Sequence, residues 1–193
     1  MSLPSQEQID ESVRINTSQI SIEDIGERTS KGIMDVLHTN ASLKAKNVKL
    51  RRVVDIMAKE ISTAAVCKKG CSYCCHIAVT ITNWEAEQLA AASDRKVSTP
   101  DLKYPDIQQD QIDYSGVACP FLKNNSCSVY DARPLACRSY FNVSSYPELC
   151  DSVKYPKQEV PQVVTSSIWN AHASINIDDP KLIVADIRAF FPK

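Results

Sequence analysis

The chain has 193 residues, of which 44% are apolar, and this composition supports a folded core and excludes an intrinsically disordered protein. Its 22 basic and 23 acidic residues give a formal net charge of -1, so no overall electrostatic field attracts it to nucleic acid or to an anionic membrane. No basic and apolar leader opens the sequence, and no later apolar run approaches the length of a membrane span. We therefore expect a cytoplasmic protein that binds neither nucleic acid nor membranes.

Helices dominate the predicted first third of the chain. Residues 1 to 20 are polar without a sustained period, which indicates a loose arm or a marginal helix. A capping pattern at Ser21 predicts a helix that ends near His38. The clearest helix is predicted at about residues 43 to 66 and leads directly into the first cysteine. Its apolar residues recur at steps of three and four: Leu50, Val53, Val54, Met57, Ile61, Ala64 and Ala65.

Four of the eight cysteines fall within nine residues, in Cys67-Lys68-Lys69-Gly70-Cys71-Ser72-Tyr73-Cys74-Cys75. The spacing of Cys71 and Cys74 suits one metal held in a tight turn, for which Gly70 can adopt a positive φ. Cys67 and Cys75 extend this set on either side, and His76 is a further candidate ligand. In an α-helix the four thiols would share one face, so a buried apolar stripe is the alternative. Disulfides are a second alternative, which a reducing compartment disfavours.

Short elements are predicted between the two cysteine groups. Alternation over residues 77 to 81 indicates an extended piece, and Thr82 with Glu85 forms a capping box that opens a helix to about Ser93. Residues 94 to 116 have the composition of a surface connection.

Composition changes near residue 99, because nine of the ten prolines follow that point. Two helices are nevertheless predicted after the last cysteine. One spans about residues 159 to 174, and the other has Asp179 as its N-cap and Pro180 as its first residue. The whole pattern predicts a mainly α-helical protein with little strand, whose helices pack around an irregular cysteine-rich centre.

We expect three regions along the chain. Residues 1–66 form an N-terminal helical extension, residues 67–155 form the metal-binding cysteine region, and residues 156–193 supply C-terminal helices that pack on the same domain.

The second cysteine group consists of Cys119, Cys127, Cys137 and Cys150, which are spaced too widely for a single knuckle. Separate turns can present the first three: Asn124-Asn125 marks one bend, and Arg133-Pro134 can open a short helix. Cys150 lies in no recognisable motif and is the least firm of the candidate ligands. Four basic residues lie close to these cysteines in the sequence: Lys68, Lys69, Arg133 and Arg138. Their positive charges would stabilise an anionic thiolate centre.

These motifs resemble the YkgJ-type cysteine-cluster family, which is described as a zinc- or iron-chelating domain. The resemblance covers about residues 67 to 150 and rests on the first cysteine run, on Thr82 and Glu85, on Cys119-Pro120-Phe121-Leu122, and on Cys127-x-x-Tyr130-x-x-Arg133-Pro134-x-x-Cys137-Arg138. In the family the spacing before the paired cysteines varies between two and three residues, and this chain has three. The resemblance implies metal chelation and no settled reaction. The implied ligands are Cys67, Cys71, Cys74, Cys75, Cys119, Cys127, Cys137 and Cys150.

The metal is expected to be soft enough for thiolates, which favours zinc or an iron–sulfur cluster over calcium or magnesium. Two tetrahedral zinc sites would use all eight cysteines, and one cubane cluster would use four. The spacing of Cys67, Cys71 and Cys74 also resembles that of radical-SAM enzymes, but the sequence that follows lacks their series of strand–helix units.

Two functions stay open, and the sequence does not decide whether the protein is an enzyme. One is a metal-binding domain with a structural or metal-handling role. The other is an iron–sulfur protein that serves electron transfer or a modification reaction; flagellin lysine methylases are similar in carrying a related cysteine cluster, although no complete SAM-binding glycine loop is found here.

The two cysteine groups are predicted to converge, and the metal is predicted to be part of the fold. Residues 116 to 158 contain few long apolar runs and four prolines, so this region has little of its own to offset the entropy of ordering. Metal binding can supply the missing free energy.

Overall fold

The computed structural model describes residues 3–68, 70–101, 106–163 and 165–192. The protein is mainly α-helical, with 51% of residues in helices and 5% in strands, which confirms the predicted fold class. Two compact units are present, each assembled from separate segments. The first unit comprises Met1–Cys67, Arg138–Tyr146 and Val160–Pro180, and the second comprises Lys68–Cys137, Pro147–Glu159 and Lys181–Lys193. No described helix has the length and apolar character needed to cross a membrane.

Long helices form the first unit. They are α1 (Gln6–Thr17), α2 (Ile22–His38), α3 (Leu43–Ile61) and α7 (Ser166–Asn176). The helix predicted from Ser21 is found where expected, with the Ser21 side chain accepting a hydrogen bond from the backbone of Asp24. The predicted helix over residues 43 to 66 ends earlier, at Ile61, and turns carry the chain on toward Cys67.

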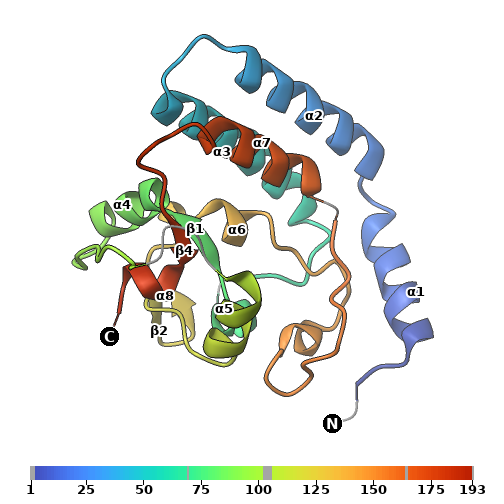
Figure 1. Ribbon diagram of the computed structural model, residues 1–193. Coiled ribbons are helices and arrows are strands. Elements are labelled where there is room, and N and C mark those ends of the chain that lie inside the picture. The colour runs from blue at the N-terminus through green and yellow to red at the C-terminus, as the bar shows by residue number, and fades with distance from the viewer. Residues whose placement is uncertain (1–2, 69, 102–105, 164, 193) are drawn as a thin grey trace. The chain divides into compact units, whose positions relative to one another are not determined.

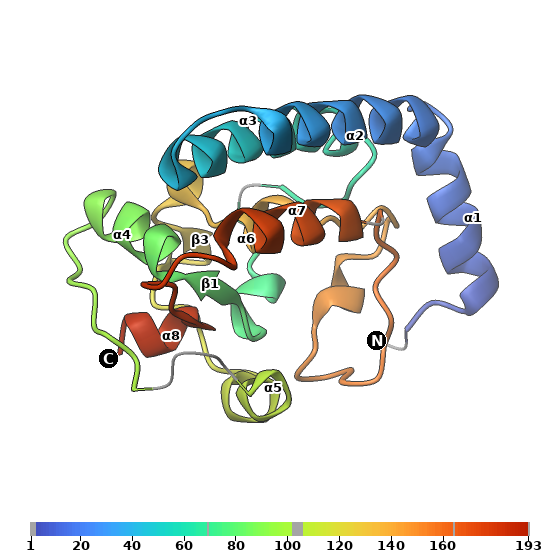
Figure 2. The ribbon, with the colours of Figure 1, turned by 45° about the horizontal axis from the view of Figure 1, so that its top comes forward.

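Helices α2, α3 and α7 pack side by side (Figures 1 and 2). Their apolar stripes form the core of this unit: Ile25, Ile33, Val36, Leu50, Val54, Met57, Ile61, Ile168, Ala171 and Ile175. Within it the buried amides of Asn47 and Asn176 exchange hydrogen bonds of 2.8 and 3.1 Å. Because a buried amide needs partners, this exchange fixes α3 and α7 in one register.

Short elements form the second unit. The strands are β1 (Thr80–Thr82), β2 (Leu122–Lys123), β3 (Ser126–Cys127) and β4 (Val184–Asp186), and the α-helices are α4 (Asn83–Ala91), α5 (Ile107–Tyr114), α6 (Leu135–Arg138) and α8 (Ile187–Phe190). Single 3₁₀ turns are η1 (Tyr73–His76), η2 (Tyr130–Ala132) and η3 (Pro147–Cys150). Strand β1 pairs antiparallel with β4, which places Thr80 opposite Asp186 (Figure 1).

The prediction of a helix that starts at Asp179 and Pro180 is wrong. The chain turns at Pro180 and Lys181 and then forms β4, because β1 offers it backbone partners and the core accepts Leu182 and Ala185. The short helix α8 begins only after Asp186, whose side chain accepts a hydrogen bond from the backbone of Arg188. Residues 94 to 116, predicted as a connection, contain the helix α5.

The core of the second unit draws on segments that are distant in sequence. It contains Val79, Ile81, Ala86, Leu89, Phe121, Val129, Ala185, Ile187, Phe190 and Phe191. The rings of Phe121 and Phe191 meet edge to face, with centroids 4.8 Å apart. As expected, residues 116 to 158 supply few of these side chains themselves. Most of the apolar surface comes from the segments before and after that span.

Candidate metal centre

The first cysteine run folds as two consecutive tight turns. Gly70 has a φ of 92°, as the turn before Cys71 was expected to require, and the backbone N–H of Cys71 donates to the carbonyl of Lys68 at 3.0 Å. The 3₁₀ turn η1 then carries Cys74 and Cys75. The four thiols therefore do not line one face of an α-helix, which excludes the interpretation as a buried helical stripe. Lys69 lies outside the described residues.

Backbone hydrogen bonds attach the second cysteine group to η1. The N–H of Cys119 donates to the carbonyl of Cys75 at 2.7 Å, and the N–H of Gly116 donates to the carbonyl of His76 at 2.8 Å. The β2–β3 hairpin then returns the chain so that Cys127 pairs with Leu122. These contacts gather Cys75, Cys119 and Cys127 in one unit from three places in the sequence.

The hairpin turn has a sequence cause. Asn124 and Asn125 have φ values of 50° and 55°, and such two-residue hairpin turns favour asparagine because it tolerates the left-handed region. The bend predicted at Asn124-Asn125 is thus the turn that carries Cys127.

Glu85 positions Cys137. The predicted capping box is present, because Thr82 accepts from the N–H of Glu85 and Glu85 accepts from the N–H of Thr82. The second carboxylate oxygen of the buried Glu85 accepts from the N–H of Leu135 at 2.8 Å. This bond satisfies a free amide at the start of α6, two residues before Cys137. The sequence motif indicated the first of these roles and gave no sign of the second.

Five thiols of the second unit interact electrostatically, and we call them the five-thiol cluster: Cys74, Cys75, Cys119, Cys127 and Cys137. Burial is the main cause that raises the pKa of Cys119, Cys127 and Cys137, and neighbouring thiolate charges raise these pKa values further. Cys137 is the common member, since it interacts with each of the other four.

The pKa values of the adjacent Cys74 and Cys75 are shifted in opposite directions. A hydrogen bond from Cys75 is the main cause that lowers the pKa of Cys74 to about 7, and the charge of Arg133 lowers it further. The same hydrogen bond, followed by burial and by nearby thiolates, raises the pKa of Cys75. Cys75 is therefore the donor of this hydrogen bond and Cys74 its acceptor.

Arg133 acts on several of these thiols. Its charge lowers the pKa of Cys74, Cys127 and Cys137. The guanidinium carbon lies 3.6 Å from the ring centroid of Tyr130, and its Nε donates to the Tyr130 carbonyl at 3.0 Å. This contact gives a physical reason for the Tyr-x-x-Arg spacing in the motif.

The other cations predicted to bracket the thiols differ in their surroundings. Arg138 belongs to the first unit, where it forms a salt bridge with Asp55. Lys68 belongs to the second unit.

Backbone amides also face two of the sulfurs. The N–H of Phe121 donates to Cys119 and the N–H of Val129 donates to Cys127, and both bonds lower the pKa of the thiol. In each case the donor is two residues after the cysteine. Such bonds favour the thiolate, which is the form that binds a metal.

Three predicted ligands are not among the five thiols defined above. Cys71 belongs to the same unit, and the buried Cys150 lies on η3, which packs against η1. Cys67 belongs to the first unit, where its sulfur accepts a 3.4 Å hydrogen bond from the N–H of Asn142. Their roles as ligands stay predictions. His76, the other candidate, has its Nδ1 3.1 Å from the carbonyl of Ser72.

The donor chemistry of the five-thiol cluster fits zinc or iron, because both accept thiolates. No pair of the eight cysteines, all of which are described, forms a disulfide. Among the described residues, no three His, Cys, Asp or Glu side chains are arranged to hold a metal ion as they stand.

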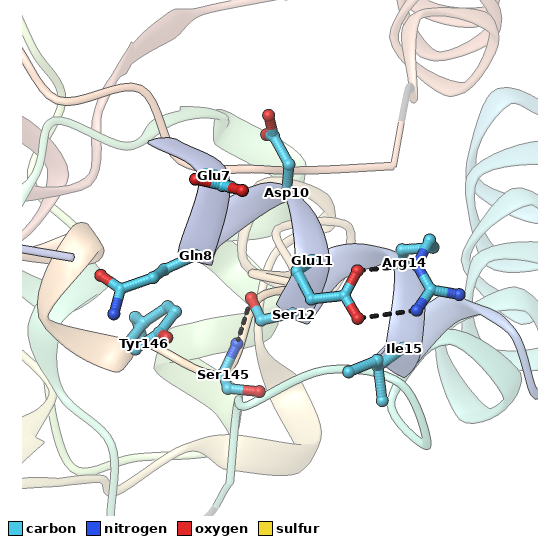
Figure 3. A pocket seen from close by; sticks show the side chains of 9 residues that line it. All are labelled: Glu7, Gln8, Asp10, Glu11, Ser12, Arg14, Ile15, Ser145 and Tyr146. Carbon is cyan, nitrogen blue, oxygen red and sulfur yellow. Dashed lines mark hydrogen bonds and ion pairs between the residues drawn. The ribbon is translucent and has the colours of Figure 1, made fainter. Parts of the chain in front are cut away.

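The first unit contains a hollow of ≈ 830 Å³ lined by α1 together with Ser145 and Tyr146 (Figure 3). Most of the described residues that line it are polar or charged, and none of them is a cysteine or histidine. Glu11 is already paired with Arg14 at 2.7 Å, and the N–H of Ser145 donates to Ser12. This lining offers no soft ligand and no nucleophile with a base.

A protein family named CxxCxxCC, described as "Putative zinc- or iron-chelating domain", matches residues 66–163, just over half of the chain. The chain belongs to this family. A metal-binding cysteine cluster for zinc or iron is accordingly a property of the CxxCxxCC domain in this chain. No match was found among the curated proteins or among the solved structures.

Proposed function

We propose that the five-thiol cluster is the metal centre of this domain and that four of its thiolates hold zinc or iron, with Cys137 among them. The observation that carries the proposal is the gathering of these thiols in the second unit: the N–H of Cys119 donates to the carbonyl of Cys75 at 2.7 Å, and Cys119, Cys127 and Cys137 pack against one apolar core. In the metal-free chain burial and mutual repulsion keep most of these thiols protonated. A divalent cation would replace the protons and cancel the repulsion.

The role we propose is structural and metal-holding. Three of the thiols pack against the apolar core of the second unit, namely Cys119, Cys127 and Cys137. They come from separate segments of the sequence. A metal bound to these three thiols and to Cys74 or Cys75 would link the turn η1, the β2–β3 hairpin and α6, none of which is long enough to be stable alone. Cys67, Cys71 and Cys150 remain proposed as further ligands or as a second site.

An iron–sulfur cluster is the alternative occupant, and the adjacent pair Cys74 and Cys75 favours it. A single tetrahedral zinc needs four thiolates and leaves one of the five unused. A cluster offers several metal atoms, so two neighbouring thiols can reach different atoms. With this occupant the protein would serve electron transfer or a modification reaction. Either occupant requires reduced thiols, which supports the expected cytoplasmic location.

The test is purification of the full chain without oxygen, followed by absorption spectroscopy and analysis of zinc, iron and sulfide. A colourless protein with zinc supports the structural centre, and a brown protein with iron and sulfide supports the cluster. Cys137→Ser should lose the metal, while Ala136→Ser, which introduces the same side chain one position earlier, should retain it. If the wild-type chain neither contains nor takes up zinc or iron, the proposal is overturned.

A further inference from the structure

Arg188 lies outside the residues that the family matches, yet it contacts the segments that carry the thiols. The family match ends at residue 163, whereas Arg188 follows β4 near the end of the chain. Pairing of β4 with β1 brings this segment beside the stretch that leaves η1. Only 6% of the Arg188 side chain is exposed, and its carboxylate partner Asp186 is fully buried.

The guanidinium of Arg188 binds the backbone on both sides of the metal centre. It donates to the carbonyls of Cys75 at 3.4 Å and Ile77 at 3.0 Å, and its Nε donates to the carbonyl of Val117 at 3.1 Å. Val117 is two residues before Cys119, so one side chain ties the segment of Cys75 to the segment of Cys119.

Asp186 holds the guanidinium in this position. Its oxygens accept from Nη1 of Arg188 at 3.0 and 3.1 Å, and one of them accepts from the N–H of Val79 at 2.6 Å. The planar fork of arginine matches this set of acceptors, and an ammonium group cannot reach all of them together.

The geometry points to Arg188 as a positioning residue of the metal centre, which sets the separation of Cys75 and Cys119. The inference rests on the function proposed above. Arg188 acts through the backbone carbonyls of Cys75, Ile77 and Val117. The C-terminal segment, residues 181–193, is thus a functional part of a domain whose family pattern does not include it.

The test compares full-length variants for zinc affinity, measured by competition with a chelator, and for the absorption spectrum of bound Co²⁺. Arg188→Met should weaken zinc binding by about 10- to 100-fold, as the loss of outer-shell partners does at other metal sites. Arg188→Lys, which keeps the charge without the fork, should fall between Met and wild type. Both should change the Co²⁺ spectrum, because the sulfur positions shift.

Leu89→Ala is the matched control, since it removes a buried core side chain of the same unit that makes none of these contacts. It should lower the melting temperature while the zinc affinity of the folded protein changes by less than about threefold. If Arg188→Met folds poorly, the zinc affinities of Arg188→Lys and Leu89→Ala are compared instead. A lower affinity in Arg188→Lys alone would support the positioning role.

Two failures can be told apart. Wild-type affinity and spectrum in Arg188→Lys and Arg188→Met, with only a lower melting temperature, would show that Arg188 is merely structural. Zinc binding that survives in Cys137→Ser would instead overturn the proposed metal centre itself.

Discussion

The two units of this protein are stabilised in different ways. In the first, helices α2, α3 and α7 have 17, 19 and 11 residues, and their apolar stripes supply the core. In the second, the longest described helix has 9 residues, the strands have two or three, and buried charged side chains join distant segments. Regular periodicity suffices for the first unit. The second depends on contacts between residues that are far apart in sequence, so we expect it to be the metal-dependent one.

Removal of the metal should give the largest effect and should separate the two units. Cys137→Ser, or a strong chelator, should make residues 67 to 150 sensitive to protease while much of the helical signal survives. Structural zinc contributes roughly 10–16 kcal/mol in small peptides, comparable to the whole stability of a domain. Limited proteolysis with mass spectrometry and circular dichroism measure the two responses.

The apolar core of the second unit sets a limit to this prediction, because the metal is not its only source of stability. Metal-free protein that melts at the same temperature and resists protease equally well would show that the thiols are a cargo or catalytic site on an independently stable scaffold. Ala136→Ser serves as the control for both measurements.

The reverse experiment is to weaken the first unit. Leu50 on α3 is 1% exposed, and Leu50→Ala should lower the free energy of unfolding by about 2–5 kcal/mol through lost burial and the cavity left behind. Urea titration followed by circular dichroism measures this loss. The zinc content of the folded fraction should not change. A parallel loss of zinc would mean that the stability of the two units is coupled.

Glu85 and Thr82 allow a finer comparison within the second unit. Thr82→Ala should cost about 0.5–2 kcal/mol, the usual value of an N-cap. Glu85→Ala should cost about 1–3 kcal/mol more, because it also removes the buried hydrogen bond to the N–H of Leu135. The two variants are compared by urea unfolding of the zinc-loaded protein. Equal costs would mean that Glu85 caps only α4.

A dependence on pH is the smallest effect we expect. The folded metal-free chain holds protons on Cys75, Cys119, Cys127 and Cys137 more tightly than the unfolded chain does, because all four pKa values are raised. Above the ordinary thiol pKa of about 8.5 the unfolded state binds fewer protons, so the stability of the second unit falls as pH rises. Cys74 contributes the opposite slope at lower pH, between its lowered pKa of about 7 and the ordinary thiol value, where stability rises with pH.

Thermal unfolding of the metal-free protein between neutral and alkaline pH measures this effect, and added zinc should abolish it. The same shifts predict that zinc affinity rises with pH, since binding must release the protons. Alkylation with iodoacetamide provides a residue-level readout: Cys74 should react first as pH rises through about 7, ahead of Cys137. Stability that is unchanged at alkaline pH would contradict the raised pKa values.

Local signals in the sequence were sufficient for the regular elements and for the family. Three signals depend on residues close together in the sequence: the N-cap at Ser21, the apolar stripe of α3, and the capping box of Thr82 and Glu85. They can therefore be recognised without a structure. The same holds for the positive φ at Gly70 and for the turn at Asn124-Asn125. The order of the cysteine motifs likewise indicated a zinc- or iron-chelating domain.

Only the tertiary structure decided how the metal centre is supported. The segment after Asp179 reads as a helix by its local capping pattern, but the available partners of β1 and the apolar core make it a strand. The reach of Glu85 to Leu135 and of Arg188 to Cys75 and Val117 spans 50 to 113 residues and leaves no local signature. A buried charged side chain forms hydrogen bonds with backbone groups that the secondary structure leaves without a partner. Which groups these are depends on the folded chain, so the spacing of residues in the sequence does not reveal them.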